Sequence, residues 1–266
     1  MLSDFHTHTT FCDGENTPEE IVLYAIDNGF ASIGFSGHGY TSFDLRYCMK
    51  DKAAYISEIN RLKKKYKNKI QVYTGVEEDA FSPVNRSDFD YIIGSSHYFL
   101  DGETYYPIDS SYDYFKKCLE LFKYDIITLS ETYYSAFCDY ILKRKPDIVG
   151  HFDVITKFDM IDTPRFLSNP EYLKIADKYM TEAVKSDVIF EVNTGAIARG
   201  LRTTPYPHEN LLYLLKKHNG KLILSSDSHR LDTLTFNFDE TKKFLRDIGF
   251  EYVYTIYDNE FKKDYL

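Results

Sequence analysis

The feature that most constrains the fold is an alternation of short apolar runs with amphipathic helical patterns along the whole 266-residue chain. Each apolar run is rich in branched and aromatic residues, and the segments between the runs repeat their apolar residues with helical spacing. Such an alternation predicts a parallel sheet whose strands are joined by helical crossovers. The expected strands are residues 2–6, 31–36, 70–76, 90–95, 147–150, 188–192 and 221–224.

The helical segments begin and end at recognisable signals. Thr17-Pro18-Glu19-Glu20 combines an N-cap residue, a proline at the first helical position and a capping-box glutamate. Asn28-Gly29 then predicts the end of that helix. The other expected helices are residues 52–67, 112–124, 126–143, 170–186, 207–218 and 234–248.

No linker, repeat or low-complexity tract interrupts this pattern, so we expect one domain spanning residues 1–266. Seven strands with helical crossovers favour an α/β fold that closes into a distorted seven-stranded β/α (TIM-like) barrel over an open doubly wound sheet. No G-x-G-x-x-G follows the first strand, which argues against dinucleotide binding.

Composition excludes several function classes. The formal net charge of −9 disfavours nucleic acid and membrane surfaces as partners, because both need a basic patch. No run approaches the roughly 18 apolar residues of a membrane span, and the N-terminus does not resemble a secretory signal. The four cysteines show no C-x-x-C spacing, which favours reduced thiols. We therefore expect a cytoplasmic protein.

Two doublets of metal-ligand residue types lie near the ends of the chain. His6 and His8 are two residues apart in or just after the first strand, and Asp227 and His229 follow the last one. In extended chain, residues i and i+2 point to the same face. Each doublet can therefore direct two ligands toward one point.

Residues of the same types follow most of the other expected strands. The carboxyl ends of the strands in a parallel barrel share one face, and active sites are built there. Imidazole and carboxylate ligands suit zinc, iron or manganese. At about three to four protein ligands per ion, the candidates predict two to three divalent transition metals. The candidate metal ligands are His6, His8, Asp13, His38, Glu77, His97, His151, Asp227 and His229.

Three neighbouring carboxylates compete for one role after the third strand. Of Glu77, Glu78 and Asp79, we select Glu77 because it directly follows the strand, which places Glu78 on the opposite face. Such a carboxylate can bridge two metals about 3.5–4 Å apart.

The remaining histidines and one aspartate receive other roles. His208 and His218 lie in or at the end of an expected helix, so we predict that neither is a ligand. Asp153 is expected to orient a histidine ligand from behind.

The order and spacing of these ligands resemble the PHP (polymerase and histidinol phosphatase) superfamily over nearly the whole chain. Residues 94–100, GSSHYFL, and 191–194, EVNT, resemble its histidinol-phosphatase branch. The resemblance implies a distorted seven-stranded β/α barrel with a trinuclear metal site. Some members carry histidine where this chain has Asp13. The implied sets are His6, His8, Glu77 and Asp227 for the first ion, Glu77, His97 and His151 for the second, and Asp13, His38 and His229 for the third.

Hydrolysis of a phosphomonoester also needs a phosphate-binding group and a proton for the leaving alkoxide. Arg199 follows the sixth strand on a glycine-flanked loop, where its guanidinium can bind phosphate through two nitrogens. Lys157 is a second phosphate-binding candidate and Arg202 a weaker one. Asp227 or His229 is the candidate that delivers the leaving-group proton through a metal-bound water.

The resemblance implies hydrolysis of L-histidinol phosphate to L-histidinol and phosphate, a step of histidine biosynthesis. Two alternatives stay open: another PHP phosphoesterase acting on phosphotyrosine, nucleotides or broad small phosphomonoesters, and a non-catalytic metal-binding barrel. A complete ligand set argues against the second alternative. The metal identity, the residues that recognise the rest of the substrate and the oligomeric state are not determined by these patterns.

Overall fold

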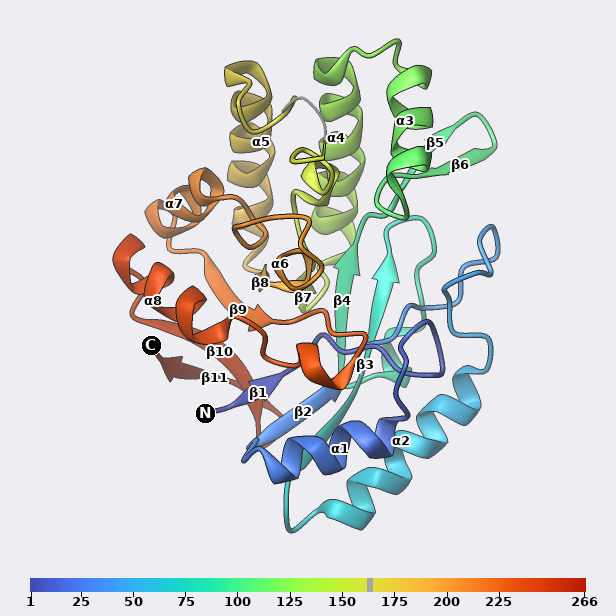
Figure 1. Ribbon diagram of the computed structural model, residues 1–266, viewed down its shortest axis with the longest axis vertical. Coiled ribbons are helices and arrows are strands. Elements are labelled where there is room, and N and C mark those ends of the chain that lie inside the picture. The colour runs from blue at the N-terminus through green and yellow to red at the C-terminus, as the bar shows by residue number, and fades with distance from the viewer. Residues whose placement is uncertain (162–164) are drawn as a thin grey trace.

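The computed structural model describes residues 1–161 and 165–266. A single large sheet curls through the middle of the molecule, and helices cover its outside (Figure 1). Its strands run parallel from the first to the eighth, and the ninth is antiparallel to the eighth. In spatial order they are β1 (Ser3–Asp4), β2 (Ser32–Phe35), β3 (Gln71–Asp79), β4 (Tyr91–Ser95), β7 (Ile148–Val149), β8 (Ile189–Asn193), β9 (Lys221–Ser225), β10 (Tyr252–Tyr257) and β11 (Glu260–Tyr265).

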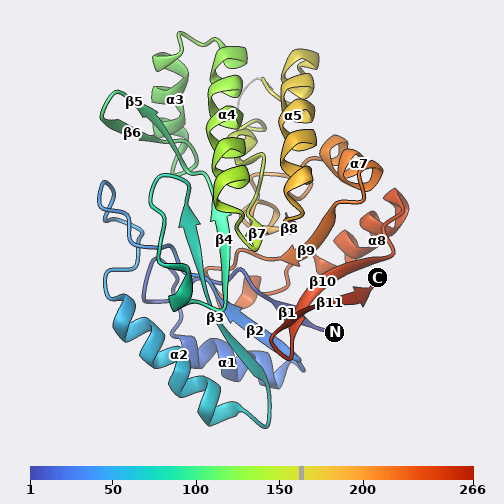
Figure 2. The same ribbon diagram turned by 180° about the vertical axis from the view of Figure 1, so that it is seen from behind.

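The crossover helices confirm the expected alternation. The capping box at Thr17 is present, with the hydroxyl and backbone of Thr17 both bonded to Glu20. Figure 1 shows α1 and α2 on one side of the sheet, with α3, α4 and α5 standing side by side at the opposite end, and Figure 2 shows the same arrangement from behind. The helices are α1 (Pro18–Asp27), α2 (Lys52–Tyr66), α3 (Tyr112–Leu121), α4 (Ile126–Arg144), α5 (Pro170–Ala183), α6 (Gly195–Ala198), α7 (Glu209–Lys217) and α8 (Phe238–Ile248).

The sheet has nine strands, two more than the seven expected. The two extra strands, β10 and β11, form a hairpin at Asp258 and Asn259, whose φ angles of 54° and 61° are those of a tight hairpin turn. A second hairpin, β5 (Tyr98–Asp101) with β6 (Thr104–Pro107), was also not expected and projects beyond β4.

A short parallel bridge joins the two distant parts of the curled sheet. Thr7, just after β1, pairs with Ser228, just after β9. The amide of His8 donates to the carbonyl of Ser228 at 2.8 Å, and the amide of Ser228 donates to the carbonyl of His6 at 3.1 Å. The segments that carry both expected ligand doublets are therefore held side by side.

Large side chains fill the inside of the curl, so it is a packed core rather than a channel. These residues come from β1 or its continuation and from most of the other strands, and burial of their apolar surface stabilises the curl. They are Phe5, Tyr73, Tyr91, Ile93, Ile148, Ile189, Ile223 and Ile256. Two further apolar clusters lie between the sheet and its outer helices. Within the described residues, no helix is long and apolar enough to cross a membrane.

Candidate active site

The carboxylate of Glu77 lies at the centre of the candidate site. Glu77 is on β3, which extends to Asp79, and it is 2% exposed. One of its oxygens, Oε2, lies 2.8 Å from Nδ1 of His38, 3.4 Å from Nε2 of His6 and 3.7 Å from Nε2 of His8. This side of Glu77 therefore faces the segments that follow β1 and β2.

The other oxygen of Glu77 faces a different pair of imidazoles. Oε1 lies 3.0 Å from Nε2 of His151, which follows β7, and 3.2 Å from Nε2 of His97, which follows β4. The two oxygens of Glu77 thus face two separate sets of imidazole nitrogens, which matches the geometry of a bridging carboxylate.

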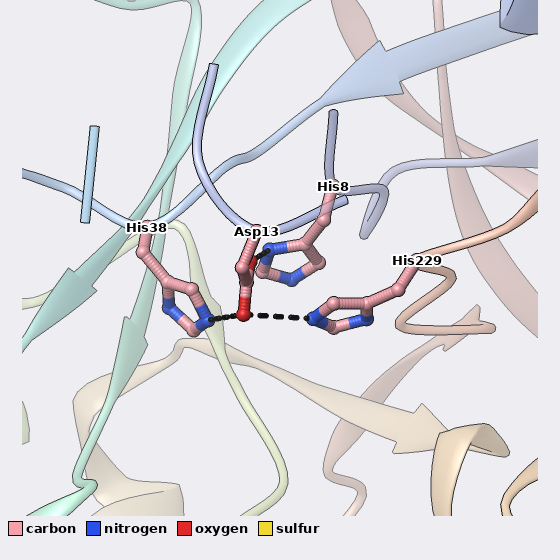
Figure 3. Close-up of side chains that lie close together, drawn as sticks. All are labelled: His8, Asp13, His38 and His229. Carbon is pink, nitrogen blue, oxygen red and sulfur yellow. Dashed lines mark ion pairs between the residues drawn. The ribbon is translucent and has the colours of Figure 1, made fainter. Parts of the chain in front are cut away.

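The carboxylate of Asp13 lies among His8, His38 and His229 (Figure 3). Its Oδ2 lies between two imidazoles, 3.5 Å from Nε2 of His229 and 3.7 Å from Nε2 of His38. Its Oδ1 lies 3.4 Å from Nδ1 of His8. The ligand atoms of these four residues all lie within 4.8 Å of one another.

Asp227 connects this centre to the candidate phosphate-binding arginine. Its Oδ1 lies 3.2 Å from Nε2 of His8 and 3.7 Å from Nε2 of His6, while Nη2 of Arg199 donates to its Oδ2 at 2.8 Å. Asp227 has a φ of 50°, a left-handed conformation that aspartate adopts more readily than most residues. The turn places Asp227 beside His229, whose Nδ1 lies 3.1 Å from the Asp227 carbonyl oxygen.

The donor atoms fit divalent cations. Four buried atoms of the site make no hydrogen bond of acceptable geometry among the described residues, despite the short contacts given above: Nε2 of His6, Nε2 of His8, Oε2 of Glu77 and Oδ1 of Asp13. Leaving a buried polar atom without a partner is costly. Coordination of a metal ion satisfies such atoms, and imidazole with carboxylate is a donor set that zinc, iron and manganese accept.

Charges within the site shift the acidity of its groups strongly. Burial disfavours a charge on His6, but Glu191, Glu77 and Asp227 outweigh burial and hold the pKa of His6 well above its ordinary value. Burial alone would raise the pKa of Glu77, yet the histidines around it, His6 and His97 among them, hold that pKa well below its ordinary value. Without metal, therefore, imidazolium protons balance the buried carboxylates.

Two carboxylates that sequence reasoning did not assign orient the histidines. Glu191 on β8 is fully buried, and its Oε1 lies 2.5 Å from Nδ1 of His6. Its Oε2 accepts hydrogen bonds from the His151 amide and the Asn193 side chain, both at 2.9 Å. Asp79 plays the same part for His97, with its Oδ2 3.2 Å from Nδ1. The polar residues of Glu191-Val192-Asn193 at two-residue spacing in an apolar strand were the available signal.

The expectation for Asp153 is wrong. Its Oδ2 lies 3.5 Å from Nη1 of Arg202 and accepts from the His208 amide at 2.9 Å, and among the described residues Asp153 makes no hydrogen bond or ion pair with a candidate histidine ligand. Arg202 is 3% exposed and also donates to Thr156, which makes it part of a buried structural network. His208 and His218 flank α7 and belong to no donor group in the described chain.

Glu78 points away from the site, as expected. Its Oε1 accepts from Nε of Arg144 at 2.8 Å and from the Tyr140 hydroxyl at 2.6 Å, and its Oε2 accepts from Nη2 of Arg144 at 2.7 Å. The strand pleat therefore separates a central carboxylate, Glu77, from a packing carboxylate, Glu78.

An open cavity of about 710 Å³ lies over these groups. Glu77, His151 and Asp227 form part of its floor, and Arg199 and Lys157 are in its walls. Nζ of Lys157 donates to the Asp109 carbonyl oxygen at 2.6 Å and lies 3.3 Å from the Asp109 carboxylate. The cavity thus brings both candidate phosphate-binding cations to the candidate metal centre.

Comparison with known proteins places these features in a family. The PHP domain model matches residues 4–195. A protein of Schizosaccharomyces pombe named "probable histidinol-phosphatase" is 27% identical over 267 residues, covering 92% of this chain and 86% of the yeast protein. The histidinol-phosphatase of Bacillus subtilis is 26% identical over 262 residues, covering 89% and 96% respectively.

A solved structure shares the fold. The histidinol phosphate phosphatase of Lactococcus lactis, complexed with zinc, L-histidinol and phosphate, superposes with a TM-score of 0.74 at 21% identity. The match covers 98% of this chain and 99% of the lactococcal one. With the family model spanning most of the sheet and most of the candidate ligands, the chain belongs to the PHP domain family.

Proposed function

We propose that this protein is a metal-dependent phosphomonoesterase that hydrolyses L-histidinol phosphate to L-histidinol and phosphate. The observation that carries the proposal is the central position of Glu77 between two sets of imidazoles, beneath a cavity that also contains Arg199. The histidinol-phosphatase names of the curated relatives and the ligands of the lactococcal enzyme support this choice of substrate.

The proposed cofactors are two to three divalent transition metals, zinc, iron or manganese. When bound, they would supply Lewis acidity toward the phosphoryl oxygens and lower the pKa of the attacking water. The contacts around Glu77, Asp13 and Asp227 support three sets of ligands, and the first two sets share Glu77. The proposed sets are His6, His8, Glu77 and Asp227, then Glu77, His97 and His151, and then Asp13, His38 and His229.

Arg199 and Lys157 are proposed to bind the phosphoryl group. Arg199 is the C-cap residue that follows α6, and its Nη2 and Nη1 both contact Asp227, at 2.8 Å to Oδ2 and 3.3 Å to the carbonyl oxygen. Its position is therefore fixed before substrate arrives, and its side chain remains 34% exposed toward the cavity. A prepositioned cation stabilises the negative charge of phosphoryl transfer without further reorganisation.

Asp227 and His229 are proposed to act on the leaving group through a water molecule. Burial would raise the pKa of Asp227, but Arg199 and His6 outweigh burial and hold it well below its ordinary value. Asp227 is then a carboxylate that can accept a hydrogen bond and orient water. Burial and the charge of His8 lower the pKa of His229, which keeps its imidazole neutral near pH 7.

We also propose that residues 1–266 act as one domain whose strands β1–β4 and β7–β9 form a distorted seven-stranded PHP barrel. The bridge between Thr7 and Ser228 supports that closure. The hairpin of β10 and β11 is then an addition to the barrel, beside β9.

One comparison of substrates tests the proposal. Turnover of L-histidinol phosphate, p-nitrophenyl phosphate and a phosphotyrosine peptide is measured on one metal-loaded preparation. The proposal expects the highest kcat/KM for L-histidinol phosphate. Similar values for all three would indicate a broad phosphoesterase, and no turnover of any would indicate a non-catalytic barrel.

A further inference from the structure

Asp109 is a carboxylate in the cavity wall that belongs to none of the candidate metal-ligand sets and that contacts Lys157, a proposed phosphate-binding residue. It follows β6, and the neighbouring Ile108 amide donates to the His97 carbonyl oxygen at 2.9 Å. On its other side, Ser110 shares a hydrogen bond of 2.5 Å with the Tyr47 hydroxyl. Both neighbours are anchored, so Asp109 is held in place above the site.

Among the described residues, only one of the two oxygens of the Asp109 carboxylate contacts a donor. Nζ of Lys157 makes its shorter contact, 2.6 Å, with the Asp109 backbone carbonyl and lies 3.3 Å from Oδ2. Within residues 1–161 and 165–266, Oδ1 has no hydrogen-bond partner. The Asp109 side chain is 18% exposed and lines the cavity, so this oxygen is an acceptor that faces the cavity without a donor from the described residues.

Two other carboxylates of the cavity, Asp44 and Asp232, differ from Asp109. Asp44 accepts hydrogen bonds at both oxygens from Arg46 and from the Tyr98 hydroxyl. Asp232 is 63% exposed and is paired with Arg230 at the rim. A charge in water or a fully bonded charge gains little from a substrate cation. Asp109 is mostly buried and only partly hydrogen-bonded, so a substrate cation stabilises it more than it would stabilise Asp44 or Asp232.

The charge of Asp109 acts on the part of the cavity where the phosphoryl group is proposed to bind. Burial would raise the pKa of Asp109, but Lys157, His97 and His151 lower it below its ordinary value, so the group is an anion at neutral pH. Asp109 is also among the charges that raise the pKa of Arg199, although Asp227 contributes more. Asp109 therefore lies within electrostatic reach of both the histidine cluster and the arginine.

We propose that Asp109 binds an ammonium group carried by the substrate on the carbon next to the phosphoester carbon, which makes the site selective for 2-aminoalkyl phosphates. The inference rests on the proposed function and deepens it, because L-histidinol phosphate carries an amine at that carbon. A carboxylate oxygen accepts a charge-assisted hydrogen bond from such an ammonium, and a shielded site strengthens it. The competing role for Asp109 is limited to holding Lys157.

The test combines Asp109→Asn with two matched pairs of substrates. The first pair is L-histidinol phosphate and 3-(imidazol-4-yl)propyl phosphate, which lacks only the amine. The second pair, O-phosphoethanolamine and ethyl phosphate, makes the same comparison without the imidazole. Asparagine keeps the size of the side chain and an oxygen that can still accept from Lys157. Asp232→Asn removes one charge from the rim and serves as the control.

In the wild-type protein we expect kcat/KM to favour the amine-bearing member of each pair. Asp109→Asn should lower that preference about 10- to 100-fold, the size expected for one charge-assisted contact, and should leave the amine-free substrates nearly unchanged. Asp232→Asn should keep the wild-type preference. An equal loss of kcat/KM for both members of a pair would mean that Asp109 only positions Lys157, and it would overturn the inference. The inference is also overturned if Asp109→Asn keeps the wild-type preference for the amine, or if the wild-type protein has no such preference.

Failure of the proposed function gives a different result. A wild-type protein that hydrolyses p-nitrophenyl phosphate but not L-histidinol phosphate has another natural substrate. The role of Asp109 is then read from O-phosphoethanolamine and ethyl phosphate, where loss of the amine preference in Asp109→Asn supports the inference and its retention or absence overturns it.

Discussion

Arg199 and Asp227 form an ion pair of 2.8 Å between Nη2 and Oδ2, while the other oxygen of Asp227 lies 3.2 Å from Nε2 of His8. The carboxylate of Asp227 therefore connects Arg199, a proposed phosphate-binding residue, to the candidate metal centre. Burial disfavours the charge on Arg199, but Asp227 outweighs burial and raises the pKa of the guanidinium. The pair positions Arg199 at the edge of the cavity, with charge that is fixed before substrate binds.

Arg199→Ala should lower kcat/KM for L-histidinol phosphate about 30- to 1000-fold, or roughly 2–4 kcal/mol of transition-state stabilisation, because a charge-assisted contact to the phosphoryl group is lost. Arg199→Lys should recover only part of the activity, since a point charge cannot make the two-pronged contact. Metal content, measured by elemental analysis, should remain that of the wild-type protein.

His6→Ala is the matched comparison for Arg199→Ala, because His6 belongs to a proposed metal-ligand set and its loss should lower both metal content and turnover. Near wild-type kcat/KM in fully loaded Arg199→Ala would contradict the assignment. The phosphoryl group would then have to be bound by Lys157, the other proposed phosphate-binding residue of the cavity wall.

Gly195→Ala should disturb the same ion pair without removing a charge. A Cβ atom at Gly195 would lie 2.7 Å from Nη2 of Arg199 and 2.9 Å from Oδ2 of Asp227, so one of the two must move. We expect kcat/KM to fall about 10- to 100-fold, as small misplacements of a positioned group do.

The control for Gly195 is Gly29→Ala. Gly29 has a φ of 74° and open space around its Cβ position, so this change should cost about 1 kcal/mol of stability and leave turnover intact. If Gly195→Ala keeps full kcat/KM, the spacing of Arg199 and Asp227 is not important for catalysis.

Glu77→Gln and Glu78→Gln should separate function from stability. Glu77→Gln should abolish turnover and reduce bound metal, because the proposed bridging carboxylate loses its charge at the centre of the imidazoles. Glu78→Gln should retain metal and activity but lower the free energy of unfolding by about 1–3 kcal/mol, because the buried contacts with Arg144 and Tyr140 are weakened. Denaturant unfolding and elemental analysis measure both effects. Equal loss of metal in the two variants would show that Glu77 was selected wrongly.

Metal removal should lower stability as well as activity. Purified protein should contain two to three equivalents of iron, zinc or manganese, and a chelator should abolish turnover. Because an ion bound only to the folded state stabilises it, saturating metal should raise the free energy of unfolding by about 3 kcal/mol or more at 100-fold excess over Kd. Less than one equivalent, with activity and melting temperature unchanged by chelation, would exclude the site.

Metal affinity should increase with pH. The pKa values of His6 and His97 are held well above the ordinary value by the neighbouring carboxylates, so both imidazoles carry protons near neutral pH when no metal is bound. A metal must displace those protons, which weakens its binding as pH falls. Titration of the metal-free protein at several pH values, followed by calorimetry, measures the trend. Affinity independent of pH between 6 and 8 would contradict it.

The candidate ligands could be selected from the sequence because their signals are local. Two-residue spacing in extended chain predicts that His6 and His8 share one face, and the same holds for Asp227 and His229. The selection of Glu77 over Glu78 follows from the pleat of one strand. The parallel sheet was equally local in origin, since each strand and crossover helix carries its own periodicity. Arg199 and Lys157 were selected by their places after strands, and the structure puts both in the cavity wall.

Contacts between distant segments were decided only by the tertiary structure. His6 and Glu191 are 185 residues apart, so no sequence spacing announces that one orients the other. Asp153 seemed equally suited to that part by its proximity to His151, yet the chain turns it toward Arg202. The position of the Asp109 carboxylate in the cavity wall likewise depends on the hairpin of β5 and β6 that precedes it. Residue types and short spacings thus determine which ligands this chain offers. Closure of the sheet decides which of them meet, because it alone fixes distances between residues far apart in the chain.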